Sequence, residues 1–496
     1  MDIKIVIEGQ EKSYAMVSDT PISFDSAMES LGLSYNRPCG GRGRCMNCAV
    51  RFSYGAPDIT VEDERALSYK EIKDGWRLGC RCTITSDCRI LVPAKLVQGL
   101  AQETQSDADR DAGAAGLGLA GAVDIGTTTI GVAILSAETG QIIASTNVTN
   151  SQRKFGADVM ARIQAAVEGH GGELAACVRS DILKGAWTLM SDLSEICDVA
   201  IAGNTTMLHL ALGYPVQGMA SYPFTPYTTA GEKHVEIERT IFNMPCISAF
   251  IGGDIVAGLY YLNMGPATGR SLFVDLGTNA EIVLFDGNRY WAASAAAGPA
   301  LEAGCISCGV ASVEGAINHI TMVDGRCQIS TIAGAPANGI CGSGVIDAVY
   351  ELHRAGIIDD GGLFDYEHSE GFELTDSLLF TPEDVQQVLL AKSAVYAAVT
   401  VLLQQAGMKA DEVEHLYVAG GLGASLRPES LFGMGMLPEE LSDRFEAVGN
   451  TALLGAARYV VTKDDAALSA IIDATTVVEL GGMPEFEQLF LEHLRL

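Results

Sequence analysis

The stretch VDIGTTTIGVAIL (residues 123–135) is repeated in pattern as VDLGTNAEIVLF (residues 274–285). Each copy is an apolar strand that ends in Asp-x-Gly-Thr and turns back into a second strand. Further along, VAIAGNTTMLHL (199–210) matches LYVAGGLGASL (416–426), each a strand, a turn of small residues and the start of a helix. This internal repeat predicts an α/β body of two duplicated units that face each other across a cleft.

The glycine turn of each copy is suited to binding phosphate. Glycine lets backbone N–H groups approach phosphate oxygens, and threonine hydroxyls add donors. Asp124 and Asp275 end the two strands, where a carboxylate can hold Mg²⁺ through water or orient an attacking water, so both are candidate catalytic residues. The candidate phosphate-binding residues are Gly126, Thr127 and Thr128 in the first copy and Gly277, Thr278 and Asn279 in the second.

Several residues outside these turns are open to two interpretations. Asn204 could contact phosphate or cap a helix. Asp254 is a candidate water-orienting carboxylate. Lys392 lies in a predicted long helix, where a solvated face is favoured over contact with nucleotide. Cys305 and Cys308 are expected to be small buried residues rather than a metal or redox pair.

The second copy is longer than the first. From Asp124 to Gly203 is 79 positions and from Asp275 to Gly420 is 145, so the second copy carries 66 extra positions. We expect the insertion within residues 302–375, where glycine-rich turns interrupt short elements. Helices of the body are predicted at residues 156–168, 172–193, 343–356 and 382–406.

Composition separates an N-terminal module from the acidic remainder. The 496 residues carry a net charge of −30, yet residues 1–97 hold 13 basic and 13 acidic side chains. Residues 98–119, rich in Ala, Gly, Asp and Gln, are predicted to form a flexible linker. A basic face for nucleic acid is not expected, so DNA and RNA are excluded as partners. No run of 18 apolar residues lacks a charge and no targeting segment is recognised, so we expect no membrane partner and a cytoplasmic location.

The N-terminal module has clustered cysteines, since six of the 13 lie between Cys39 and Cys88. The arrangement is Cys39-x5-Cys45-x2-Cys48, followed by RLGCRC at residues 77–82. Iron–sulfur clusters need four thiolates, and glycines in such a loop let backbone N–H groups reach sulfur. A zinc site is disfavoured because zinc more often binds two short Cys-x2–4-Cys units. From spacing alone, the fourth ligand could be either Cys80 or Cys82.

This cysteine spacing resembles that of [2Fe–2S] ferredoxins with a five-residue gap. The order of a hairpin (3–17), a helix (21–33) and the cysteine loop is similar to that family too. The resemblance implies an α+β, β-grasp-like ferredoxin domain over residues 1–97, and RLGC resembles the ferredoxin RLAC ending. It therefore implies a [2Fe–2S] cluster held by Cys39, Cys45, Cys48 and Cys80. Five arginines near the cysteines are either solvated or dock an acidic surface: Arg37, Arg42, Arg44, Arg77 and Arg81.

The paired phosphate motifs resemble those of the superfamily of sugar kinases, acetate kinases, actin and chaperone ATPases, over about residues 120–480. Residues 419–424 (AGGLGA) match its adenosine motif. The resemblance implies an actin-like ATPase that binds ATP and Mg²⁺, with one lobe at 120–265 and a second at 266–496. The implied adenosine-binding glycines are Gly420, Gly421 and Gly423.

The combination of these two modules resembles the reductive activators of corrinoid-dependent proteins, which belong to methyltransferase systems of anaerobic microbes. The phrase QRKFGADVMARI (152–163) is similar to that family as well, without an assigned role. The resemblance implies ATP-dependent one-electron reduction of Co(II) corrinoid to Co(I), with the cluster delivering the electron. The partners would be a corrinoid protein and an external low-potential donor, and a homodimer is allowed.

Three alternatives remain at the level of sequence. The acceptor could be another enzyme, such as a radical-forming dehydratase. The chain could be an ATP-gated redox switch that binds a partner without reducing it. It could also be a sugar kinase with an attached ferredoxin, although no convincing sugar site is found.

Overall fold

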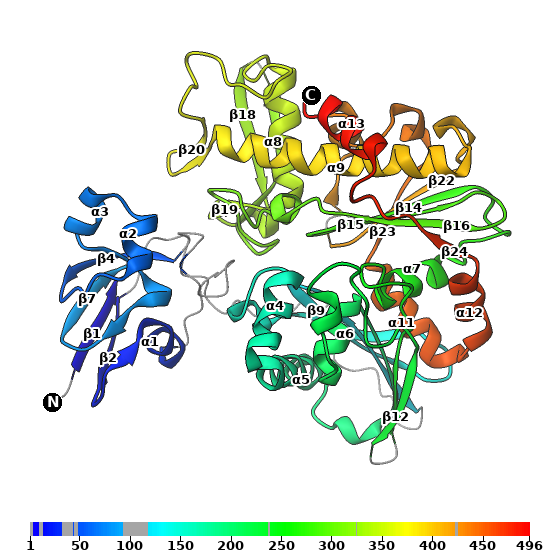
Figure 1. The fold of residues 1–496 in the computed structure, drawn as a ribbon, viewed down its shortest axis with the longest axis horizontal. Coiled ribbons are helices and arrows are strands. Elements are labelled where there is room, and N and C mark those ends of the chain that lie inside the picture. Colours follow the sequence, from blue (N-terminus) through cyan, green and yellow to red (C-terminus); the bar gives the residue numbers. More distant parts are fainter. Residues whose placement is uncertain are drawn as a thin grey trace.

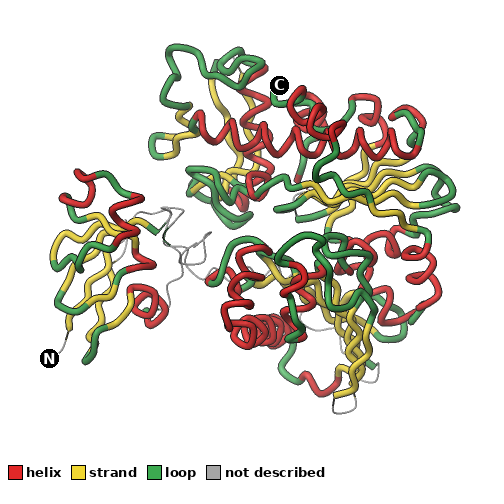
Figure 2. Tube along the Cα trace, in the orientation of Figure 1, coloured by secondary structure: helices red, strands yellow, loops and turns green. Residues whose placement is uncertain are grey.

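The computed structural model describes residues 3–8, 13–31, 43, 48–92, 118–236, 239–323, 325–421 and 425–496. Positions 98–117 of the predicted linker lie outside the described residues, and strand β8 already begins at Leu119. Figure 1 shows the elements in chain order, and Figure 2 shows that helices cover the sheets of the larger body on both sides.

The N-terminal part contains a five-stranded sheet in the order β2-β1-β7-β4-β5. Strands β1 and β2 are antiparallel, which confirms the expected hairpin. Ile5, Ile7, Phe24 and Ile90 are fully buried in its small core. The elements are β1 (Ile3–Glu8), β2 (Ser13–Ser18), β3 (Ile22–Ser23), α1 (Phe24–Ser30), β4 (Ala49–Tyr54), α2 (Val61–Ala66), α3 (Tyr69–Lys73), β5 (Trp76–Leu78), η1 (Gly79–Arg81), β6 (Thr83–Ile84) and β7 (Cys88–Leu91).

The first lobe of the larger body is built on a six-stranded sheet in the order β10-β9-β8-β11-β13-β12. Strands β8, β9 and β10 form an antiparallel meander, and β11 and β13 join it in parallel. The elements are β8 (Leu119–Ile125), β9 (Thr129–Ser136), β10 (Ile142–Thr149), α4 (Val159–Ala165), α5 (Gly171–Leu189), β11 (Ile196–Gly203), α6 (Thr205–Leu212), β12 (Glu232–Glu236), β13 (Arg239–Asn243) and α7 (Gly253–Leu262).

The second lobe repeats this topology, in the order β23-β22-β14-β15-β16-β24. Strands β14, β15 and β16 form the same antiparallel meander, and β22 and β23 join in parallel. The predicted duplication is therefore confirmed. The elements are β14 (Ser271–Leu276), β15 (Ala280–Phe285), β16 (Tyr290–Ala295), η7 (Pro299–Glu302), α9 (Pro382–Ala406), β22 (His415–Ala419), α10 (Pro428–Gly433), β23 (Phe445–Gly449), α11 (Thr451–Thr462), α12 (Asp465–Asp473), β24 (Thr475–Val477) and α13 (Pro484–Glu492).

The extra positions of the second copy form elements of their own after η7. Three strands make a small sheet in the order β18-β17-β19. Because these elements leave β16 and return to β22 through α9, the insertion does not disturb the repeated sheet order. They are β17 (Ala316–Val323), β18 (Arg326–Thr331), β19 (Gly339–Ile340), α8 (Gly342–Arg354), β20 (Phe372–Thr375) and β21 (Leu378–Phe380).

Helices α7 and α11 follow equivalent strands of the two sheets and pack against each other between the lobes (Figure 1). One apolar cluster joins residues of both sheets and both helices, including Ala122, Leu259, Phe273 and Ala456. A Cβ atom at Gly455 would lie 2.0 Å from the carbonyl oxygen of Ala257, so only glycine allows this approach. The crossing places the N-termini of both helices at the cleft between the lobes.

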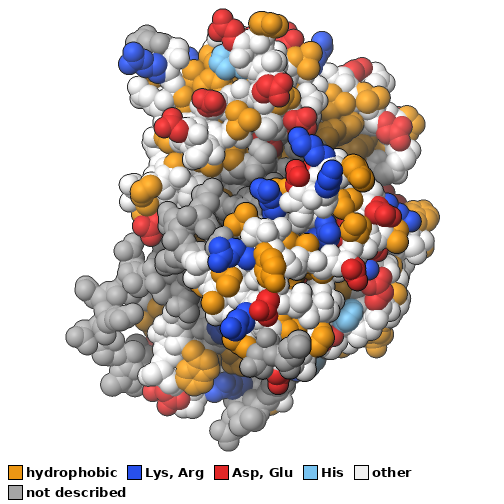
Figure 3. Space-filling model, turned by 90° about the vertical axis from the view of Figure 1, so that its left-hand side faces the viewer, with side chains coloured by type: hydrophobic (Ala, Val, Ile, Leu, Met, Phe, Trp, Pro, Cys, Tyr) orange, Lys and Arg blue, Asp and Glu red, His pale blue; other side chains and the backbone are white. Residues whose placement is uncertain are grey.

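Helix α9 runs through the core of the second lobe. Among the described residues it is the one helix long and apolar enough to cross a membrane by length and composition, but 72% of its apolar window is buried inside the protein. Packing against the second-lobe core accounts for this apolar character. On the face drawn in Figure 3, acidic and basic side chains are scattered among hydrophobic ones, and the described residues form no broad basic surface there.

Candidate functional site

The two predicted phosphate loops are the turns between β8 and β9 and between β14 and β15. Asp124 and Asp275 occupy equivalent positions near the ends of β8 and β14, and both are half-buried. A Cβ atom at Gly126 would lie 2.6 Å from the Thr129 carbonyl oxygen, so this tight turn requires glycine. The same test at Gly277 meets no atom closer than 3.6 Å, so its backbone is open to a ligand.

A cluster of carboxylates lines the region between the loops. Burial raises the pKa of Asp124 to about 6, against an opposing hydrogen bond from Asn450 Nδ2 at 2.9 Å. Burial and then the charge of Asp124 raise the pKa of Asp254 to about 7. Burial and then the charge of Asp254 raise the pKa of Asp275 to about 8. Each of these charge effects requires that the aspartates lie near one another, so the three carboxyl groups share one site. Such a site favours a positively charged ligand.

Asn450 was missed in the sequence because 326 positions separate it from Asp124. It caps α11, where its Oδ1 accepts from the Leu453 N–H at 2.8 Å, and its amide donates to Asp124. Among the described residues, no three acidic, His or Cys side chains lie close enough to ligate one metal ion directly.

Asn204 caps a helix, which is one of its two predicted interpretations, and it also contacts the first phosphate loop. Its Oδ1 accepts from the Met207 N–H at 2.9 Å and so caps α6, while its Nδ2 donates to Thr127 Oγ1 at 3.3 Å. This side chain therefore ties the first phosphate loop to α6, the helix that follows β11.

The phrase QRKFGADVMARI forms a support beneath the first phosphate loop. Arg162 is fully buried, and its guanidinium donates to the carbonyl oxygens of Thr127 at 2.6 Å and Gly156 at 3.0 Å. It also donates to Gln152 Oε1 at 3.2 Å. Burial lowers the pKa of Arg162 to about 10, so the side chain stays charged at neutral pH. The motif thus places a buried cation directly behind the loop.

The predicted adenosine loop follows β22. Gly420 has a φ of 96°, and a Cβ atom there would lie 2.8 Å from Asp275 Oδ1, so glycine brings this loop beside the second phosphate loop. A Cβ atom at Gly421 would meet nothing within 4 Å, which leaves room for a ligand. Gly423 lies outside the described residues.

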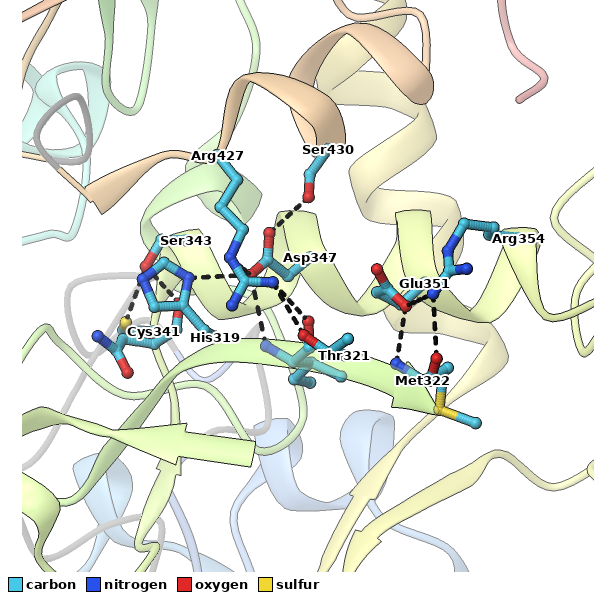
Figure 4. Close-up of polar contacts among 12 residues, drawn as sticks. His319, Thr321, Met322, Cys341, Ser343, Asp347, Glu351, Arg354, Arg427 and Ser430 are labelled. Carbon is cyan, nitrogen blue, oxygen red and sulfur yellow. Dashed lines mark hydrogen bonds and ion pairs between the residues drawn. The ribbon is translucent and has the colours of Figure 1, made fainter. Parts of the chain in front are cut away.

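A buried polar network anchors the segment after this loop (Figure 4). Asp347 of α8 is 1% exposed and accepts from Ser430 Oγ at 2.6 Å. The same carboxylate lies 3.0 Å from His319 Nδ1 and 3.4 Å from Arg427 Nε. Arg427 also donates to the Ile320 carbonyl oxygen at 3.1 Å. The network therefore joins α8, β17 and α10, and it holds the chain that leaves the adenosine loop.

Two expectations about isolated side chains were wrong. Lys392 is buried rather than solvated, because α13 and the turn after α10 cover this face of α9. Its Nζ donates to the carbonyl oxygens of Met434 at 2.8 Å and of Arg495. Cys305 is exposed and Cys308 only half-buried, since the turn between η7 and β17 lies at the surface.

The described cysteines favour Cys80 over Cys82 beside the cysteine loop. The Sγ atoms of Cys48 and Cys80 lie 3.2 Å apart, well beyond the ~2.05 Å of a disulfide bond. Cys82 is 5% exposed, and burial raises its thiol pKa strongly. Cys39 and Cys45 lie outside the described residues.

Local hydrogen bonds explain the pairing of Cys48 with Cys80. The Gly79 N–H donates to the Cys48 carbonyl oxygen at 2.8 Å, and the buried Asp63 accepts from the Leu78 N–H at 2.7 Å. These bonds fix both sides of the turn that carries Cys80.

The nearby arginines differ in their surroundings. Arg77 neither faces solvent nor offers a docking surface, because it is 7% exposed and donates to three backbone carbonyls. Arg81 forms an exposed ion pair with Glu62 at 3.2 Å. Arg37, Arg42 and Arg44 lie outside the described residues.

Relatives with named activities are similar to most of the chain. It is 28% identical over 413 residues to "Corrinoid activation enzyme RamQ" of Eubacterium limosum, covering 75% of this chain and 69% of the relative. It is 26% identical over 382 residues to "[Co(II) methylated amine-specific corrinoid protein] reductase" of Methanosarcina barkeri, covering 69% and 70%. A stretch of 70 residues is 33% identical to a component of the Na(+)-translocating NADH-quinone reductase of Haemophilus ducreyi, covering 14% and 17%.

The fold has a full-length counterpart among solved structures. "Reductive activator for corrinoid,iron-sulfur protein" superposes with a TM-score of 0.71 at 24% identity, covering 100% of this chain and 98% of that one. Residues 118–266 match the family described as "RACo middle region", and residues 269–496 match "C-terminal domain of RACo the ASKHA domain". The actin-like ATPase body that the motifs predict is thereby confirmed. The chain belongs to the RACo family of reductive activators of corrinoid proteins.

Proposed function

We propose that this chain uses ATP to drive the one-electron reduction of a corrinoid protein from Co(II) to Co(I). The observation that carries the proposal is the union, in one chain, of a ferredoxin-type cysteine pair with two facing phosphate loops. An electron carrier gains from ATP only where the transfer is uphill. The names of the two long relatives support a corrinoid protein as the acceptor.

The electron would enter and leave through a [2Fe–2S] cluster held by Cys39, Cys45, Cys48 and Cys80. When bound, the cluster supplies a one-electron carrier. The Cys48 and Cys80 sulfurs lie 3.2 Å apart without a disulfide bond, so both are placed to serve as ligands of one such group. The hydrogen bond from the Gly79 N–H to the Cys48 carbonyl oxygen holds Cys48 and Cys80 close together, so these two ligands are preorganised.

The ATP phosphates would bind between the turns at Gly126–Thr128 and Gly277–Asn279. Asp124, Asp254 and Asp275 would hold Mg²⁺ through its water shell, because their raised pKa values show how strongly the site disfavours uncompensated negative charge. The adenosine moiety would lie against Gly420, Gly421 and Gly423. Asn450 keeps one Asp124 oxygen occupied and so orients the other.

ATP binding or hydrolysis would act on the lobes, and lobe closure can change which state of a bound acceptor is favoured. The four cysteines would hold the cluster that supplies the single electron for conversion of Co(II) to Co(I), and an external low-potential donor would replace that electron. We also propose that the chain is divided into a ferredoxin domain (1–97), a linker (98–119), a first ATPase lobe (120–265) and a second ATPase lobe (266–496). The cytoplasmic location and the homodimer remain predictions.

The test is anaerobic absorbance of a Co(II) corrinoid protein mixed with the reduced chain, with and without Mg-ATP. We expect the Co(I) spectrum only with ATP. Cys80→Ser and Asp275→Asn should each abolish it, while the matched Cys82→Ala variant keeps it. An intact cluster with ATP turnover but no Co(I) from several corrinoid proteins would contradict the proposal and favour another acceptor or a redox switch.

A further inference from the structure

Glu302, at the end of η7, lies where the two lobes meet, and no sequence pattern singled it out. Its Oε2 atom accepts a hydrogen bond from Thr278 Oγ1 at 2.5 Å, within the second lobe. The same oxygen lies 3.4 Å from Thr128 Oγ1, in the phosphate loop of the first lobe. One carboxylate oxygen therefore bridges two loops that are predicted to bind phosphate.

The groups around Glu302 favour a negatively charged carboxylate at this position. Its side chain is half-buried, and burial raises its pKa, while the two threonine hydroxyls and the charge of Arg162 favour the ionised form. Its own charge contributes to the raised pKa of Asp275. The carboxylate is thus part of the electrostatic environment of the cleft rather than of a remote ion pair.

A carboxylate and a phosphate group make the same demands on these hydroxyls. Both are anions that accept hydrogen bonds from Thr128 and Thr278, and two anions at one pair of donors repel each other. A nucleotide phosphate that enters the loops must therefore take the hydroxyls from Glu302. The contact that is lost includes the Thr128 bond, which spans the lobes.

We infer that Glu302 is a positioning residue that bridges the two phosphate loops and is displaced by nucleotide phosphate, so that nucleotide binding resets the geometry between the lobes. The inference rests on the nucleotide-binding part of the proposed function and on nothing about corrinoid. It supplies the step by which occupancy of the loops reaches the relative position of the lobes.

The test measures equilibrium binding of a fluorescent ATP analogue, with ATP and ADP as competitors, in the absence of corrinoid protein and reductant. Glu302→Gln keeps the shape and a hydrogen-bond acceptor but removes the charge. We expect it to bind nucleotide on the order of tenfold more tightly, because the competing anion is gone. Unchanged or weaker binding would overturn the inference.

Two further variants separate competition from a general charge effect. Glu281→Gln is the matched control, because Glu281 is a cleft carboxyl that accepts from Ser294 at 3.1 Å and from neither loop threonine. We expect its affinity to stay near that of wild type, because the substitution removes no contact with Thr128 or Thr278. Glu302→Asp keeps the charge but shortens the reach to Thr128, so we expect tighter binding by a few-fold. If Glu302→Gln does not fold, an unchanged affinity of Glu302→Asp overturns the inference by itself.

These outcomes are independent of electron transfer. If the wild-type protein forms no Co(I) with ATP but the Glu302 variants show the expected changes in nucleotide affinity, the proposed function is contradicted and the role of Glu302 stands. Normal Co(I) formation with no change in affinity would do the reverse.

Discussion

The crossing of α7 and α11 offers a sharp test of how the lobes position the site. A Cβ atom at Gly455 would lie 2.0 Å from the Ala257 carbonyl oxygen and 2.5 Å from its carbon. Ordinary contact begins at 3.4 Å, so Gly455→Ala must move the helices apart by about 1.4 Å. Both contacting atoms belong to the backbone and no side chain can turn aside. We therefore expect the upper end of overpacking costs, about 3 kcal/mol.

The displacement should reach the phosphate loops because α11 carries Asn450 at its N-terminus. Its hydrogen bond to Asp124 is 2.9 Å long, and a shift of about 1.4 Å is enough to break it. Hydrogen bonds to charged groups contribute roughly 1.5–3 kcal/mol. Loss of even half of the lower of these two free energies would weaken ATP binding several-fold. Because the displacement breaks the whole hydrogen bond, we expect the ATP KM to rise about tenfold.

The assay is steady-state ATP hydrolysis together with urea unfolding of the ATPase body. Gly172→Ala is the matched control, because Gly172 is also helical, in α5, and its Cβ would meet nothing within 4 Å. It should stabilise the protein by about 0.5 kcal/mol and leave the KM unchanged. Wild-type stability and KM in Gly455→Ala would refute the argument that this crossing sets the site.

Three further predictions concern the cluster, the cleft and its support. Cys80→Ser should lose the visible absorption of the iron–sulfur cluster, whereas Cys82→Ala should retain it; equal loss in both would contradict the choice of ligand. Because Asp254 and Asp275 have raised pKa values of about 7 and 8, the folded protein holds extra protons, and its thermal stability should fall as pH rises from about 4 to 8. Mg²⁺ should reduce that loss, and a flat pH profile would argue against the acid cluster. Arg162→Lys should destabilise the protein by about 2 kcal/mol and raise the ATP KM, because a lysine cannot donate to both carbonyls; unchanged kinetics would refute its role.

The local elements of the body could be predicted because their signals are local. Apolar strands ending in Asp-x-Gly-Thr appear at β8 and β14, and the predicted helix at 382–406 coincides with α9. Glycine turns also follow from their neighbours in sequence. Predictions that depend on the tertiary environment of a side chain were less successful. Lys392 and Arg77 are charged residues of a type that is usually exposed, but other elements cover both.

The site residues that sequence reasoning missed share one property. Asn450 contacts Asp124 across 326 positions, and Glu302 contacts Thr128 across 174. Neither residue belongs to a repeated pattern, and each makes a contact with the lobe opposite its own that only the packed structure reveals. Arg162 was inside a recognised stretch of sequence, yet its role as a cation behind the loop depends on how α4 is placed against the turn between β8 and β9.

The amino-acid sequence by itself determined the two phosphate turns, the duplication and the cysteine spacing, because backbone conformation and strand pattern depend on adjacent residues. Only the tertiary structure decided which acids share one cleft, which cysteine pairs with Cys48, and which side chain bridges the lobes. Those outcomes depend on desolvation and on distances of a few ångströms between segments far apart in the chain. In the larger body these distances arise when α7 and α11 pack together, and in the N-terminal part when the turn at Gly79 bonds to Cys48.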